Sequence, residues 1–353
     1  SPNFDIVNPG PPINFINNFK DFLKDIIVNE FGWEYIPNRQ RIVAMWAIIN
    51  KKNSYNVKHN HQNCYLSSAY YVKKPKDSGE ITFFDPKEAK TYRFPEIEKN
   101  TDFSVEKITI KPEEGELLIF PSYLYHEVSE NLVNEDRIVV SFNVDIGYWK
   151  IFMKNYQTYK AFPTPVFHFS LENQKGFNEE LKKFILNLKN KKKDGIKKSN
   201  QGGWHSPNFD LKNDKSVLKF ISVFEVYVKN VVDEIGWKYD SDRVKIEAMW
   251  SIINKKGSFN IQHNHPNAFL SSAYYVKYPK DSGNIKFFDP REQKTIRYPK
   301  IKNYNEMSAQ IVEITPKEGD LLIFPSYLYH AVNENLSNED RIIISFNVDI
   351  KYR

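Results

Sequence analysis

The chain contains the same domain-length sequence twice, and this duplication constrains its fold more than any other feature. Residues 59–98 match residues 263–302 at 28 of 40 positions, and residues 113–147 match residues 317–351 at 27 of 35. A repeat of this length is a duplicated domain, not one unit of a solenoid. The chain, at 353 residues, is also long enough for two domains that each bury a core.

The two copies differ in what precedes them in the chain. Ser1 to Asp5 matches Ser206 to Asp210, so about 50 residues of the second copy have no counterpart in the first. We therefore expect a first domain at residues 1–150, which lacks an N-terminal strand and helix, and a complete second domain at residues 151–353. The join should lie near residues 147–161.

Three segments have apolar residues at helical spacing, namely residues 12–31, 177–188 and 217–235. A glycine follows the first and the third and fits a helix end. The lysine-rich tract at residues 189–198 is typical of a solvated loop, with contact to an acidic partner as the less favoured alternative.

Short apolar runs fill the rest of each copy and predict strands. In the first copy these are Ile42 to Asn50, Tyr65 to Lys73, Ile81 to Phe84, Leu117 to Phe120 and Arg137 to Val144. The last run alternates, with Arg137, Val139, Ser141 and Asn143 on one face. Strands at this density predict a mainly β fold with flanking helices, an antiparallel sandwich or barrel in each copy.

Six of the eight histidines form two sets with identical spacing. In the first set, His59 and His61 are two positions apart and therefore share one face of an extended strand. His126 follows 67 residues after His59. The second set is His263, His265 and His330.

Three neutral imidazoles that converge can bind Fe, Zn, Cu or Ni and leave coordination positions open for other ligands. An isolated pair such as His59 and His61 is more often structural, but the complete set with a third histidine favours a metal site. Because the copies arose by duplication, their agreement is not independent evidence.

An arginine follows each third histidine by eleven residues, at Arg137 and Arg341. A guanidinium on an inward strand face binds a carboxylate or a phosphate in a bidentate manner. The alternative is a structural ion pair with Asp136 or Asp340, but adjacent strand residues point to opposite faces. We expect a carboxylate-bearing cosubstrate.

Composition excludes several classes of protein. The net charge of +6 is too weak and too mixed to indicate nucleic-acid binding, and one cysteine rules out internal disulfides and fits a reducing compartment. The chain has no run of about 18 apolar residues, so we expect no membrane span. We expect a cytoplasmic protein, in the host cytoplasm if a phage encodes it.

Further short motifs surround the histidines and the arginine. In the first copy these motifs and their neighbours are His59-Asn60-His61, Leu66 to Val72, Ser78-Gly79, Phe84-Asp85-Pro86, Pro112, Gly115 to Ser122, His126-Glu127-Val128 and Arg137-Ile138. With them, each copy resembles the prolyl-hydroxylase-like group of Fe(II)/2-oxoglutarate-dependent oxygenases, in particular a small family of bacterial and phage 2OG-Fe(II) oxygenases. The resemblance covers residues 40–147 and 244–351.

The resemblance implies a double-stranded β-helix, a jelly-roll, cupin-like fold, in each copy. It implies that His59 and His126 bind iron, that Arg137 holds the distal carboxylate of 2-oxoglutarate, and that Tyr71 and Ser141 line the cosubstrate pocket. In the second copy these residues are His263, His330, Arg341, Tyr275 and Ser345. The implied activity is oxidation of a C–H bond, coupled to decarboxylation of 2-oxoglutarate and consuming molecular oxygen.

One position departs from the superfamily. The superfamily has His-x-Asp or His-x-Glu, whereas this chain has His61 and His265 at the third position. A third imidazole can still bind but removes one negative charge, which can favour another metal. Asp85 and Asp289 are the nearest carboxylates, but Asp-Pro is more typical of a turn.

Two alternatives to the dioxygenase therefore remain. They are a cupin-like enzyme that uses another metal and a non-catalytic binding module that retains the fold. The substrate is not indicated by the sequence. We also expect the two copies to pair as an intramolecular pseudo-dimer.

Overall fold

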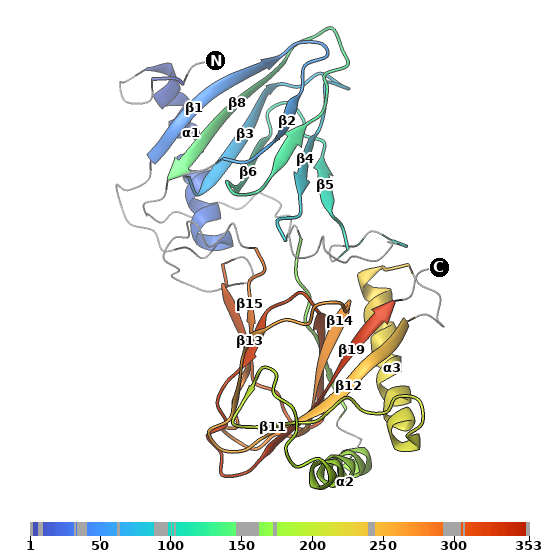
Figure 1. Ribbon diagram of the computed structural model, residues 1–353. Helices are drawn as coiled ribbons and strands as arrows, with labels where there is room; N and C mark the ends of the chain where they lie inside the picture. The colour runs from blue at the N-terminus through green and yellow to red at the C-terminus, as the bar shows by residue number, and fades with distance from the viewer. Residues whose placement is uncertain are drawn as a thin grey trace. The chain divides into compact units, whose positions relative to one another are not determined.

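The computed structural model describes most of the chain in two compact units (Figure 1). The described residues are 3–5, 10–31, 33, 41–61, 64–87, 98–99, 101, 104–145, 162–171, 175–238, 244–291, 305 and 308–350. Unit 1 comprises residues 1–88, 105–162 and 291–309, and unit 2 comprises residues 89–104, 163–290 and 310–353. The expected boundary at residues 150 and 151 lies outside the described residues and stays a prediction.

Unit 1 contains eight strands in two antiparallel sheets. The strands are β1 (Arg41–Asn50), β2 (Asn56–His59), β3 (Leu66–Lys73), β4 (Ile81–Phe84), β5 (Lys107–Ile110), β6 (Leu117–Pro121), β7 (His126–Val128) and β8 (Arg137–Asp145). One sheet has the order β1-β8-β3-β6 and the other β2-β7-β4-β5. Except between β4 and β5, the chain changes sheet with every strand, which is the winding of a double-stranded β-helix.

A helix covers one sheet of unit 1. Helix α1 (Pro11–Asp25) continues into a short π-helix, η1 (Ile26–Glu30). Its apolar side buries Ile16, Leu23 and Ile27 against Met45 and Phe142 of the β1-β8-β3-β6 sheet. The other face of that sheet points toward the second sheet, so the inward-facing residues of β8 are enclosed between them. The glycine expected to end this helix lies outside the described residues.

Unit 2 repeats this architecture with additional elements. Its repeated strands are β12 (Val244–Asn254), β13 (Phe259–His263), β14 (Leu270–Lys277), β15 (Ile285–Phe288), β16 (Ile311–Ile314), β17 (Asp320–Pro325), β18 (His330–Val332) and β19 (Arg341–Ile350). The additional elements are β9 (Phe167–Ser170), α2 (Lys175–Lys191), β10 (Asn200–Gln201) and β11 (Trp204–His205). They extend the sheets to β11-β12-β19-β14-β17-β9 and β10-β13-β18-β15-β16.

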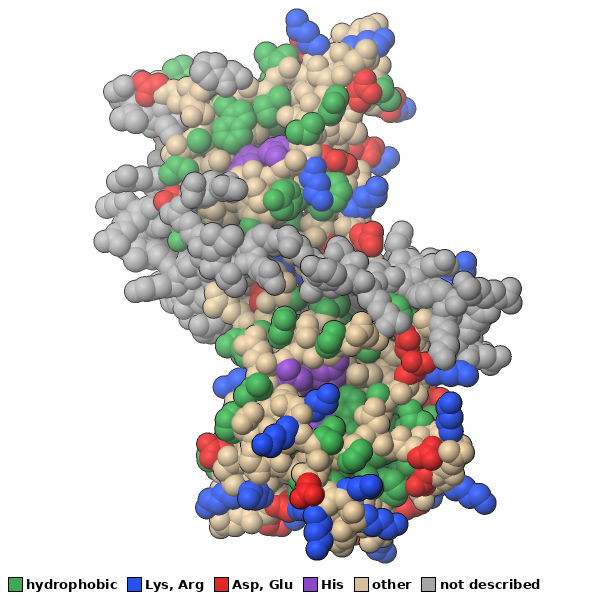
Figure 2. Space-filling view, in the orientation of Figure 1, with side chains coloured by type: hydrophobic (Ala, Val, Ile, Leu, Met, Phe, Trp, Pro, Cys, Tyr) green, Lys and Arg blue, Asp and Glu red, His purple; other side chains and the backbone are tan. Residues whose placement is uncertain are grey.

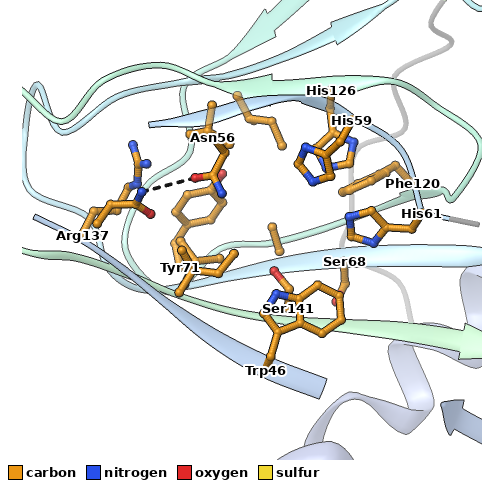
Figure 3. A pocket seen from close by; sticks show the side chains of 16 residues that line it. Trp46, Asn56, His59, His61, Ser68, Tyr71, Phe120, His126, Arg137 and Ser141 are labelled. Carbon is orange, nitrogen blue, oxygen red and sulfur yellow. Dashed lines mark hydrogen bonds between the residues drawn. The ribbon is translucent and has the colours of Figure 1, made fainter. Parts of the chain in front are cut away.

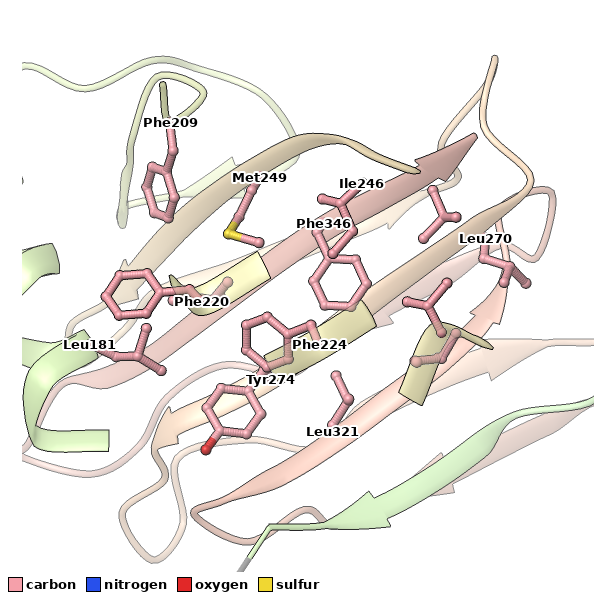
Figure 4. Close-up of a cluster of buried hydrophobic side chains, with 14 of the residues drawn as sticks. Leu181, Phe209, Phe220, Phe224, Ile246, Met249, Leu270, Tyr274, Leu321 and Phe346 are labelled. Atoms are coloured by element: carbon pink, nitrogen blue, oxygen red, sulfur yellow. The ribbon is translucent and has the colours of Figure 1, made fainter. Parts of the chain in front are cut away.

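Helix α3 (Lys215–Ile235) packs on the larger sheet of unit 2. Asp214 caps its first turn by accepting the N–H groups of Ser216 and Val217, and Gly236 ends it in the left-handed region at φ 80°. Figure 4 shows Phe220 and Phe224 of α3 against residues of the sheet. The prediction of this helix and its glycine end is confirmed.

Each unit also includes a segment of the other repeat. Residues 98, 99 and 101 belong to unit 2, where the N–H of Lys99 donates to the Gly236 carbonyl at 2.9 Å and the Thr101 hydroxyl donates to the Ile235 carbonyl at 2.6 Å. In unit 1, the Asn305 amide donates to the Glu30 carbonyl at 2.8 Å. No sequence pattern indicated this exchange.

Helix α2 extends to Lys191, so the start of the lysine-rich tract is helical and the expectation of a loop holds only beyond it. Among the described residues, no helix has both the length and the apolar character needed to cross a membrane.

Candidate metal centre

The strand register brings the histidines of the first copy together. His59 on β2 is the direct cross-strand partner of His126 on β7, and their ring centroids are 4.3 Å apart. His61 follows β2, and its N–H donates to the Ser122 carbonyl at 2.9 Å. Its ring centroid lies 5.2 Å from each of the other two. One potential ligand atom from each of the three lies within 4.8 Å of the others.

The second copy builds the same cluster. His263 pairs with His330 across β13 and β18, at a centroid separation of 4.3 Å. His265 lies 5.3 Å from His263 and 5.1 Å from His330. Figure 2 shows histidine side chains reaching the viewed surface in each unit. Both sequence-derived sets of three are therefore close in space.

Backbone carbonyls fix the tautomer of two imidazoles in the first copy. Nδ1 of His59 lies 2.7 Å from the Val57 carbonyl, and Nδ1 of His126 lies 3.1 Å from the Leu124 carbonyl. A carbonyl only accepts hydrogen bonds, so each Nδ1 carries the proton. The lone pair of each ring is then on Nε2, which leaves that atom available to a metal ion.

A side chain orients the third imidazole. Oδ1 of Asn143 accepts from Nδ1 of His61 at 2.8 Å, and Ser67 donates to the same oxygen at 2.9 Å. In the second copy, Asn347 accepts from His265 at 2.8 Å. The sequence analysis assigned no role to these asparagines. The signal was the alternation of the last strand, which places Asn143 on the same face as the arginine.

Burial favours the neutral imidazole at His61, His126 and His265. Desolvation lowers the pKa of His126 to about 4, and it is also the main reason that the pKa of His61 is lowered. In the second copy, burial lowers the pKa of His265 to about 4. Neutral imidazoles bind metal without first losing a proton.

Arg137 is fully buried with part of its guanidinium unpaired. Its Nη1 donates to the carbonyls of Ser78 and, at 3.2 Å, Ser129. Its Nε and Nη2 are buried without a hydrogen-bond partner, and no carboxylate among the described residues forms an ion pair with it. The alternative of a structural ion pair with Asp136 is therefore not observed. Two buried N–H groups side by side suit the two oxygens of a carboxylate.

These groups line one cavity of about 280 Å³ in unit 1. Figure 3 shows the three imidazoles at one end and Arg137 with Tyr71 at the other, while Ser141 lies along the wall. Burial lowers the pKa of Arg137 and raises that of Tyr71, and the proximity of the two groups partly offsets both shifts. The cavity thus has a nitrogen-donor end and a cationic end.

The arginine of the second copy is also buried with part of its guanidinium unpaired. Arg341 is fully buried, and its Nη1 donates to three backbone carbonyls, among them that of Gly283 at 3.0 Å. Its Nε and Nη2 and the hydroxyl of Tyr275 are buried without a partner. Ser345, like Ser141, is buried on the same strand as the arginine. Burying these unpaired polar groups costs free energy of folding unless a ligand forms hydrogen bonds with them.

Asp85 lies outside the cluster. Its carboxylate accepts the Lys87 N–H at 2.9 Å and lies 3.5 Å from the Lys87 ammonium. This arrangement fits the turn expected of Asp-Pro. The groups of three that could hold a metal among the described residues are the two histidine sets.

A family model described as "Putative 2OG-Fe(II) oxygenase" matches residues 44–143 and 248–347. The chain belongs to this family. Each match contains a complete histidine triad and its arginine, so the oxygenase domain is repeated in tandem. The protein is accordingly a 2-oxoglutarate-dependent dioxygenase with Fe(II) and 2-oxoglutarate as cofactors.

Solved structures include similar chains at low sequence identity. A prolyl-4-hydroxylase of Pseudomonas putida is 10% identical over 54% of this chain and 94% of its own, with a TM-score of 0.40. HygX of Streptomyces hygroscopicus, with nickel and 2-oxoglutarate bound, is 12% identical over 54% of this chain and 84% of its own, with a TM-score of 0.39. No curated protein sequence matches this oxygenase.

Proposed function

We propose that the 2OG-Fe(II) oxygenase uses both repeats as hydroxylase sites. In this proposal His59, His61 and His126 hold Fe(II) in the first repeat, and the second triad does so in the second. The observation that carries the proposal is the pairing of each triad with a buried, partly unpaired arginine in the same unit.

The donor set fits Fe(II). Imidazole nitrogen is a suitable ligand for iron, and three ligands on one side leave positions for a cosubstrate and oxygen. The triad carries no anionic ligand, so the bound metal ion would keep its full charge. That charge favours a dianionic cosubstrate over a neutral one.

The remaining residues orient the cosubstrate. Nε and Nη2 of Arg137 would each donate to one oxygen of the distal carboxylate of 2-oxoglutarate. Tyr71 and Ser141 would border its carbon chain between the arginine and the histidines. The bound iron supplies the oxidising chemistry, whereas the protein holds the reactants and limits access of water.

Molecular oxygen and an organic substrate with an accessible C–H bond are the further reactants. The first cavity, at about 280 Å³, is at the small end of the range for ligand pockets, and the cosubstrate would occupy its length from the arginine to the histidines. We therefore infer that the substrate approaches the histidine end from outside the cavity, and that only its reacting group reaches the metal.

Oxygen-dependent succinate formation tests this proposal. Anaerobic protein loaded with Fe(II) and 2-oxoglutarate should release succinate and carbon dioxide when oxygen is admitted, slowly without substrate. The double variant His126→Ala/His330→Ala should not. If the double variant releases as much succinate as the unsubstituted protein, the assignment of the triads is refuted. Consumption of 2-oxoglutarate without oxygen would favour a different metal enzyme.

A further inference from the structure

The second metal centre carries a serine hydroxyl that lies outside the repeated constellation. Oγ of Ser199 is 3.2 Å from Nε2 of His263. Nδ1 of the same ring is 2.7 Å from the Ile261 carbonyl and must therefore carry the proton. Nε2 is then the nitrogen of His263 that has a lone pair for a metal ion.

The neighbouring hydrogen bonds fix the direction of the Ser199 proton. The amide of Asn260 donates to Oγ of Ser199 at 3.1 Å, and the side-chain oxygen of Asn260 accepts from Asn254 at 3.1 Å. Because Oγ is an acceptor toward Asn260, its own proton is free to point to His263. The hydroxyl thus occupies the lone pair that an ion would need.

The backbone holds this serine in place. It directly precedes β10, in which Asn200 pairs with Asn260 of β13. The Ser199 carbonyl accepts the N–H of Ile261 at 3.0 Å. β10 and β11 belong to different sheets, and the indole of Trp204 on β11 donates to the Lys192 carbonyl at 2.8 Å, directly after α2. The contact with the imidazole therefore belongs to a segment, residues 199–205, that is anchored to both sheets of unit 2 and to the end of α2.

The next strand, β11, approaches the same histidine cluster through a tryptophan. His205 on β11 stacks on Trp250 with an interplanar angle of 11°, at a centroid distance of 5.9 Å. Trp250 in turn lies 5.5 Å from His265, the third imidazole of this cluster. The segment of residues 199–205 therefore lies next to two imidazoles of the cluster, His263 directly and His265 through Trp250.

We propose that Ser199 competes with Fe(II) for His263, so that the second site accepts the ion only when this hydroxyl turns away. An ion bound at about 2.1 Å from Nε2 requires the same lone pair, and a neutral serine hydroxyl is a poor substitute ligand. The inference rests on the proposed function, since it assumes that the second triad binds metal. Loss of the hydroxyl should tighten Fe(II) binding by about threefold to tenfold, the range set by one neutral hydrogen bond.

Anaerobic Fe(II) titration of single-site proteins tests this. The variant His59→Ala/His126→Ala leaves only the second triad, and Ser199→Ala is added to it. Ser199→Thr keeps the hydroxyl and Gln201→Ala alters an exposed neighbour two positions along the same segment, so both serve as matched controls.

Competition is supported if Ser199→Ala binds Fe(II) more tightly and the two control variants, Ser199→Thr and Gln201→Ala, do not. Unchanged affinity would overturn it, and weaker affinity would overturn it by making Ser199 a ligand. The protein that keeps only the first triad, His263→Ala/His330→Ala, is titrated in parallel. If it binds Fe(II) but the protein with only the second triad does not, with or without Ser199, the second triad is not a metal site. If neither single-site protein binds Fe(II), the proposed function itself fails.

Discussion

The buried arginine of each repeat gives the sharpest quantitative prediction. We consider Arg137→Gln in a protein whose second triad is disabled by His263→Ala/His330→Ala, so that only the first site is measured. Glutamine keeps a polar amide on a shorter side chain, but it removes the positive charge and the paired N–H groups.

The magnitude follows from the two unpaired atoms, Nε and Nη2 of Arg137. A hydrogen bond to a charged group contributes about 1.5–3 kcal/mol, so two of them to one carboxylate contribute at least about 3 kcal/mol. Arg137→Gln should therefore raise the Kd for 2-oxoglutarate by more than about a hundredfold. Because the site is fully buried, the effect should persist at high salt.

Calorimetric titration of the Fe(II)-loaded protein under anaerobic conditions measures this Kd. The control ligand is 2-oxobutanoate, which has the same metal-binding end but no distal carboxylate. Its weak affinity should be the same for the protein that retains Arg137 and for the Arg137→Gln variant. Arg341→Gln, measured with only the second triad intact, should reproduce the result.

Two outcomes would refute this reasoning. Unchanged 2-oxoglutarate affinity would mean that the guanidinium does not hold the carboxylate. Equal loss of affinity for both ligands would mean that the substitution collapses the cavity, and the arginine would then be structural.

Three further predictions concern the surroundings of the first site. Asn143→Ala should weaken Fe(II) binding by about tenfold to a hundredfold in anaerobic titration, because the third imidazole loses its orienting acceptor, whereas Asn143→Asp should retain it. Gly79→Ala should lower the free energy of unfolding in urea by at least about 2 kcal/mol, because its φ is +100° and a Cβ would collide with the guanidinium; Gly115→Ala, at φ +87° with open space around it, isolates the backbone cost. His126 alone should contribute roughly 2 kcal/mol to the stability that metal-free protein loses between pH 7.5 and 5, because the unfolded state protonates His126 below about pH 6.5 and the folded state only near its pKa of about 4; urea unfolding of His126→Gln at both pH values should show a pH dependence that is smaller by this amount.

Sequence reasoning worked best where a period or a spacing had one structural solution. The strand at Arg137–Asp145 and the helix at Lys215–Ile235 follow from periods of two and 3.6 residues. The convergence of His59, His61 and His126 could be anticipated from their spacing and residue type, although β2 ends at His59 and His61 lies beyond the strand. The direct pairing of His59 with His126 across β2 and β7 could not, since these strands have only four and three residues.

What sequence reasoning missed depends on contacts between distant segments. Asn143 lay on the expected face, but its role appears only once the ring of His61 arrives from another part of the fold. The strands next to Ser199, β10 and β11, have two residues each, too few to leave a periodic signal. Their positions are set by the pairing of β10 with β13 and of β11 with β12.

The metal content of the chain tests the central claim most directly. After anaerobic equilibration with Fe(II) and removal of unbound ion, the account predicts two tightly bound ions per chain, one for each triad. It predicts one ion for either His126→Ala or His330→Ala and none for the double variant. A metal content that is the same in all four proteins would contradict it.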